Sequence, residues 1–92
     1  MRVRFQVIPM SLIMDKRRKA IDIAVYSSLY TFSEDGMECD PAHGAIAERA
    51  HVGIGTVIRS LKRLTDMKYI SQEKRKDSKG GKISNKYTFL TR

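Results

Sequence analysis

The residues with the most suggestive spacing lie in the run HVGIGTVIRSLKRL, from His51 to Leu64. Its two glycines, Gly53 and Gly55, could form a phosphate-binding loop or mark the start of a helix. A dinucleotide-binding loop needs a preceding strand and a third glycine, and a P-loop ends in Gly-Lys-Ser/Thr. The pattern before this run is helical, and neither ending is present. We therefore interpret Gly53 as the N-cap of a helix, a position that tolerates glycine.

Gly55 then falls in the first turn of this helix, where a glycine costs roughly 1 kcal/mol relative to alanine. One explanation is that a ligand approaches the backbone closely at this point, which a side chain would hinder. The other explanation is that the position has no special role. The sequence leaves both explanations open.

No set of residues has the spacing of a catalytic or metal site. Paired carboxylates and a catalytic triad are not apparent, and His43 and His51 have no cysteine or carboxylate at ligand spacing. Cys39 is the single cysteine, which excludes an intramolecular disulfide and favours a reducing compartment. We expect a cytoplasmic protein that is not an enzyme and that uses no metal, no cofactor and no evident small-molecule ligand.

The charge of the chain is unevenly distributed. The formal net charge is +8 over 92 residues, with an isoelectric point near 9.9. Residues 1–58 carry equal numbers of acidic and basic side chains, so the whole excess lies in residues 59–92. This concentration predicts a polyanionic partner on that side of the protein. No apolar run approaches the roughly 18 residues that a membrane-spanning helix needs, so we expect no membrane association.

The first 40 residues predict a short strand, a helix and a loop. Arg2–Val7 alternates apolar and polar residues, as a half-buried strand does. Asp15 could cap a helix beginning at Lys16, with a polar loop over Ser33–Asp40. The predicted apolar stripe of the helix is Ile21, Ala24, Val25, Ser28, Leu29 and Phe32. The cations Lys16–Lys19 would oppose the helix dipole, so they are either solvated or in contact with phosphate or a partner.

The middle of the chain predicts a helix-turn-helix. Asp40-Pro41 is an N-cap followed by a first-turn proline, which predicts a helix over 42–50. Residues 51–53 form the turn, and a second helix follows over 54–67. We expect the buried stripe of the second helix to be Val57, Leu61, Leu64 and Met67, helped by Ile54 and Ile58.

The opposite face of this second helix is polar and basic. In a helix-turn-helix the second helix enters the major groove of DNA, where arginine can pair with guanine and threonine can meet a thymine methyl or a phosphate. The alternative is an ordinary solvated helix face. The candidate DNA-binding residues of this helix are Gly55, Thr56, Arg59, Lys62 and Arg63.

The remainder predicts a basic β-hairpin. Tyr69–Lys76 and Ile83–Leu90 have strand patterns, with a glycine-containing turn over residues 76–82. Clustered cations of this kind could bind a sugar-phosphate backbone through counterion release. The alternative is an edge hairpin kept soluble by lysines. The candidate DNA-binding residues of the hairpin are Lys74, Arg75, Lys76, Lys79, Lys82 and Lys86.

Together these elements predict a single α+β domain over 1–92, a winged helix-turn-helix. It would have a three-helix core, a C-terminal β-hairpin wing and a short N-terminal strand, with the helix-turn-helix over about 41–67 and the wing over about 69–90.

The sequence also resembles a winged helix-turn-helix family of small bacterial, plasmid and phage proteins, replication initiators and replisome organisers. The resemblance is carried by PAHGAIAERAHVGIGTVIRSLKRLTDMKYI and GGKISNKYTF. The family shows a proline-started helix, Ile-Ala-Glu, Thr-Val-x-Arg-x-Leu-x-x-Leu and Gly-Gly-x-x-Ser-Asn-x-Tyr. This chain departs from the family at His51, where glycine is usual, and at Gly53-Ile54-Gly55, where a serine cap and polar residues are usual.

The resemblance implies double-stranded DNA binding in transcription regulation or in plasmid or phage DNA replication, with a possible homodimer. Because the polar surface at the start of the second helix is reduced, readout would depend more on Thr56 and Arg59 or on DNA shape. The alternative from another class is a protein-interaction winged helix in a replication or conjugation complex, whose basic wing meets an acidic protein. RNA binding is a third possibility that the helix-turn-helix disfavours.

Overall fold

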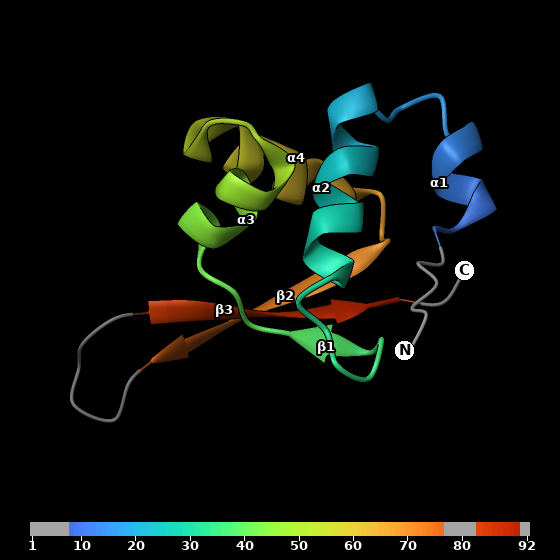
Figure 1. The fold of residues 1–92 in the computed structure, drawn as a ribbon. Helices are drawn as coiled ribbons and strands as arrows, with labels where there is room; N and C mark the ends of the chain where they lie inside the picture. Colours follow the sequence, from blue (N-terminus) through green and yellow to red (C-terminus); the bar gives the residue numbers. More distant parts are fainter. Residues whose placement is uncertain (1–7, 77–82, 91–92) are drawn as a thin grey trace, which may run out of the picture.

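The computed structural model describes residues 8–76 and 83–90, which form an α+β domain (Figure 1). The strand expected over Arg2–Val7 lies outside these residues, as do Lys79 and Lys82. The elements are α1 (Met10–Met14), α2 (Ala20–Tyr30), β1 (Glu38–Cys39), α3 (His43–Ala50), α4 (Ile54–Asp66), β2 (Ile70–Lys76) and β3 (Ile83–Phe89).

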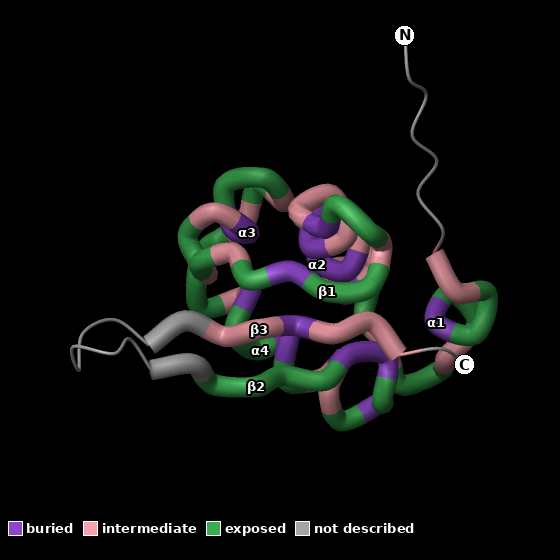
Figure 2. The backbone as a smooth tube through the Cα atoms, turned by 90° about the horizontal axis from the view of Figure 1, so that it is seen from below, coloured by how far each residue is buried: buried purple, intermediate pink, exposed green. Residues whose placement is uncertain are grey.

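The three strands form an antiparallel sheet in the order β1-β3-β2. The helices α2, α3 and α4 cover one face of this sheet, and α1 lies beyond α2, on the side away from α3 (Figures 1 and 2). β2 and β3 pair from Ile70 opposite Phe89 to Lys76 opposite Ile83, which confirms the predicted hairpin strands. The helices therefore form one layer of the domain and the sheet forms the other (Figures 1 and 2).

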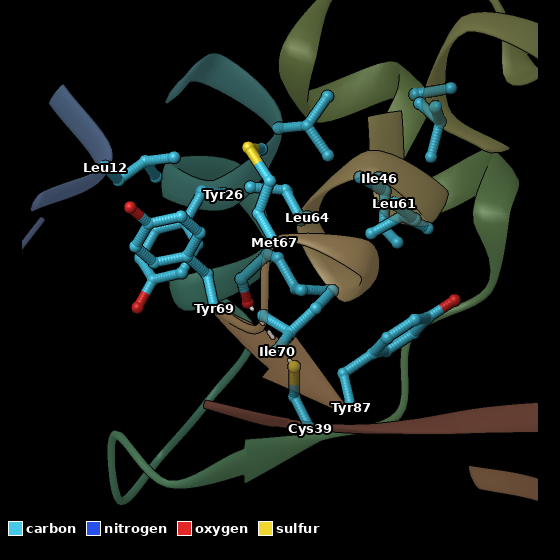
Figure 3. Packing of buried hydrophobic residues seen from close by; sticks show 14 residues of the cluster. Leu12, Tyr26, Cys39, Ile46, Leu61, Leu64, Met67, Tyr69, Ile70 and Tyr87 are labelled. Atoms are coloured by element: carbon cyan, nitrogen blue, oxygen red, sulfur yellow. Dashed lines mark hydrogen bonds between the residues drawn. The ribbon is translucent and has the colours of Figure 1, made fainter. Parts of the chain in front are cut away.

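The core lies between the helices and the sheet, and α1 contributes Leu12 to it (Figure 3). Tyr87 of β3 and Ile70 of β2 face the helices and are buried. The stripe predicted for α4 is confirmed at Val57, Leu61, Leu64 and Met67, and Val25, Ser28 and Leu29 of α2 are buried as expected. Apolar residues at helical spacing thus meet in one cluster.

Two residues predicted to help bury α4 do not do so. Ile54 and Ile58 are exposed by 51% and 47%, so that prediction was wrong. Ser60 is instead fully buried, on the side of α4 that meets α2. The buried arc of α4 is therefore rotated toward Ser60, which turns Ile54 and Ile58 outward.

The N-terminal part differs from the prediction of one helix capped by Asp15. α1 ends at Met14, and α2 begins only at Ala20 with Lys19 as its N-cap. Asp15 accepts the backbone N–H of Arg17 at 2.9 Å and so stabilises a turn between the two helices. The helix begins later because the Asp22 carboxylate accepts the backbone N–H of Lys19 at 2.8 Å, as in a capping box.

Two further boundaries differ from the sequence prediction. α3 begins at His43 with Ala42 as its N-cap, so Asp40-Pro41 precedes the helix instead of starting it. Residues 38–39, expected within a loop, form strand β1, with Cys39 opposite Tyr87 of β3. A strand of two residues is too short to show a period of two, and its pairing with β3 is non-local.

The turn between α3 and α4 depends on a left-handed residue. His51 has φ 59° and ψ 45° and ends α3, which confirms the predicted turn. Left-handed backbone is costly for residues with a Cβ, and glycine adopts it freely. His51 therefore holds a backbone conformation that glycine would adopt at lower cost.

We expect His51→Gly to raise the free energy of unfolding by about 0.5–1 kcal/mol, because glycine relieves the left-handed strain. Urea denaturation followed by circular dichroism measures this change. Glu48→Gly, placed inside α3, is the matched control and should lower the free energy of unfolding by about 1 kcal/mol. A loss of stability in His51→Gly would contradict the strain argument.

Candidate functional site

The outward face of α4 is the centre of the candidate site. α4 follows α3 after a short turn, and its inward face packs against α2, α3 and the sheet. On the opposite side, at helical spacing, lie Gly55, Arg59, Lys62 and Asp66, all of them exposed. This face offers two cations, one carboxylate and one glycine to an outside partner.

The side chain of Arg59 runs toward the first turn of α4, where its guanidinium lies near Thr56 and Gly55. Its Nη2 is 3.4 Å from the Oγ1 of Thr56, and a Cβ placed on Gly55 would lie 3.5 Å from its Nη1. That distance is ordinary van der Waals contact. Apart from the chain neighbours of Gly55 and the nearby backbone of α4, no other atom of residues 8–76 and 83–90 comes within 4 Å. The fold therefore does not require glycine at position 55. Of the two explanations for Gly55, close approach of a partner is compatible with this open surface.

Arg63 was predicted to bind DNA from the exposed face of α4, but its guanidinium forms an ion pair with Asp22 of α2. Arg63 Nη2 and Nε donate to the two oxygens of Asp22 at 2.9 and 3.0 Å. Ser60 Oγ donates to the same carboxylate at 2.6 Å, and Asp22 itself is fully buried. The candidate DNA-binding residues of α4 are thus divided, because Arg63 holds α4 to α2 while Arg59 and Lys62 are exposed.

This ion pair changes the titration of both partners. Burial alone would raise the pKa of Asp22, but hydrogen bonds from Arg63, the Lys19 backbone and Ser60 outweigh it and lower the pKa. The hydrogen bond that Arg63 donates to Asp22 raises the pKa of Arg63. Asp22 therefore stays ionised at neutral pH and keeps Arg63 in place.

The hairpin places two of its predicted cations on opposite faces. Gln72 of β2 donates to Thr65 Oγ1 of α4 at 2.7 Å, so its face of β2 looks toward α4. Lys74, two residues further along, shares that face and is exposed. Lys86 pairs across from Glu73 on the other face, where its Nζ lies 2.8 Å from Glu38. Of the hairpin cations whose side chains the structure describes, Lys74 is the one on the face of β2 that looks toward α4.

The backbones of Arg75 and Lys76 continue β2 beyond Lys74. In the stretch Lys16–Lys19, Arg17 forms an ion pair with Asp15 at 2.9 Å, and Arg18 Nε donates to the backbone oxygen of Ile13 at 2.9 Å. Lys16 and Lys19 are exposed. Lys19 lies beside the Asp22–Arg63 pair, which places it near one flank of α4.

The structure also shows an acidic hollow that the sequence did not predict. Its volume is about 370 Å³, and it lies near β1, away from Arg59 and Lys62. Cys39 lines this hollow. Burial raises the pKa of its thiol to about 12, so this cysteine is unreactive at neutral pH. Within residues 8–76 and 83–90, no group of three or more histidine, cysteine or acidic side chains could hold a metal. The residues lining the hollow are Phe32, Glu34, Asp35, Glu38, Cys39, Asp40 and Lys86.

Comparison of the chain with known protein families, with curated proteins and with solved structures found no match. In the part of the chain that the structure describes, no helix has both the length and the apolar character needed to cross a membrane. A function for this protein is therefore argued from the geometry of its own residues.

We expect Asp22→Asn to lower the free energy of unfolding by about 2–4 kcal/mol, because it leaves Arg63 without its buried partner. Chemical denaturation at pH 7 measures this loss. Glu34→Gln, which changes an exposed carboxylate, should have little effect. Equal losses in the two variants would contradict the central role of Asp22.

The same pair predicts a pH dependence of stability. Because the pKa of Asp22 is lower in the folded state, its stabilisation is present above the unfolded value of about 3.9 and is lost as the pH falls through the folded value. The free energy of unfolding, measured from pH 7 downward, should fall less steeply in Asp22→Asn than in the wild type. Parallel curves would rule out this contribution.

Proposed function

We propose that this protein is a winged helix-turn-helix that binds double-stranded DNA, with α4 in the major groove and the β2–β3 hairpin as its wing. The observation that carries the proposal is the exposed face of α4, where Gly55, Arg59 and Lys62 lie outward on the second of two helices joined by a short turn. Lys74 of β2 continues this face toward the hairpin. Cations on adjacent elements favour a polyanion.

The dimensions of α4 suit this role. A helix of 13 residues is about 20 Å long, and the major groove of B-DNA accepts a helix. Arg59 is the residue best placed to reach a base edge, because no carboxylate binds its guanidinium in the described part of the chain. Lys62 and Lys74, as flexible point charges, suit phosphates.

In this proposal Arg63 is a positioning residue. Its guanidinium is held by Asp22, so it sets the orientation of α4 instead of reading a base. Lys86 has a smaller part than predicted, because Glu38 neutralises it. The biological role that we propose is transcription regulation or the initiation of plasmid or phage replication.

We expect binding to duplex DNA to weaken steeply with salt. If three or more cations meet phosphates, log affinity should fall against log salt concentration with a slope of about −3 or steeper. Arg59→Ala should cost about 1–3 kcal/mol on the best duplex and should relax the preference at one base pair. Fluorescence anisotropy on duplexes selected from a random library measures both effects.

Equal losses on every duplex for Arg59→Ala would remove Arg59 from base readout. An absence of binding to any duplex at low salt would overturn the DNA-binding proposal. Retained binding to an acidic protein under those conditions would favour the protein-interaction alternative.

The two faces of the hairpin provide a further test. Lys74→Gln should weaken binding to all duplexes by a similar factor and make the salt slope shallower by about one phosphate contact. Lys86→Gln is the matched control and should change affinity much less, because Lys86 already pairs with Glu38. The same anisotropy titrations measure both variants. A larger effect of Lys86→Gln would show that the opposite face of the hairpin meets the DNA.

A further inference from the structure

Two isoleucines are exposed on the helix that carries the candidate site. Ile54 and Ile58 stand one turn apart on α4 and are exposed by 51% and 47%. Ile58 immediately precedes Arg59 and lies one turn before Lys62, so an apolar strip runs beside the cationic one. Exposed apolar residues scattered singly are ordinary, but this pair is contiguous and lies on the proposed binding surface.

Within residues 8–76 and 83–90, neither isoleucine belongs to the buried core, although the Cδ1 of Ile54 lies beside Gly44 of α3. The inward arc of α4 is filled by Val57, Ser60, Leu61 and Leu64, and Ile58 adds nothing to it. A second copy of this chain is a poorer occupant, because facing α4 helices would bring two cations of each copy, Arg59 and Lys62, against a single carboxylate, Asp66. The neighbouring cations instead complement a polyanion that also carries apolar groups.

Duplex DNA presents one such group in its major groove, the C5 methyl of thymine. We propose that Ile58, supported by Ile54, packs against thymine methyl groups and so makes thymine at one or two positions part of the sequence preference. This inference rests on the proposed DNA binding by α4. Arg59 would then read a polar base edge while Ile58 reads the methyl group of a base pair nearby.

Replacing thymine by deoxyuridine removes only that methyl group. On a duplex selected from a random library, we expect the wild type to lose about fourfold in affinity at one or two thymine positions, since burial of one methyl contributes about that factor. Ile58→Ala should bind the thymine duplex more weakly and should no longer distinguish thymine from deoxyuridine there. Ile13→Ala, which truncates an exposed isoleucine on α1, is the matched control and should behave as the wild type.

The variants and duplexes form a double-mutant cycle, which cancels any change that deoxyuridine makes to the DNA itself. Circular dichroism should show that Ile58→Ala is folded, because the side chain is half exposed. Equal sensitivity to deoxyuridine in the wild type and Ile58→Ala, or no sensitive position at all, would overturn the inference and leave DNA binding intact. Failure of every duplex to bind at low salt would overturn the proposed function and this inference together.

Discussion

The buried carboxylate of Asp22 is the interaction on which the arrangement of the helices depends. It accepts hydrogen bonds from the N-terminus of its own helix and from Ser60 and Arg63 of α4. An ionised group in the interior is costly unless it is fully paired. α4 therefore cannot rotate or slide against α2 without leaving this charge unsatisfied, and one orientation of α4 is strongly preferred.

That orientation decides which residues of α4 meet the outside. With Ser60 and Arg63 held at α2, the outward face is centred on Gly55, Arg59 and Lys62. Ile58 is then turned out of the core. The same contact that stabilises the helix pair thus selects the chemistry of the exposed surface, which carries one arginine, one lysine, one carboxylate and an apolar strip.

The pleat of the sheet likewise places the charged side chains of the hairpin on two opposite faces. Gln72 bonds to α4, so alternate residues of β2 look toward α4 and those between them look away. Lys74 extends the cationic face of α4, whereas Lys86 is neutralised by Glu38 beside the acidic hollow. The excess of positive charge in the last third of the sequence is therefore not one continuous patch in the described residues.

Elements with local signals could be predicted from the order of the amino acids alone. The apolar stripe of α4, the turn before it and the two hairpin strands follow from periodicity and turn chemistry, and the structure confirms them. Periodicity shows which residues share a face, but not how far a neighbouring helix covers it. The exposure of Ile58 and the pairing of Arg63 with Asp22, 41 residues away, required the tertiary structure, as did the pairing of β1 with β3. These features arise from contacts between distant segments, which leave no pattern in the sequence near either partner.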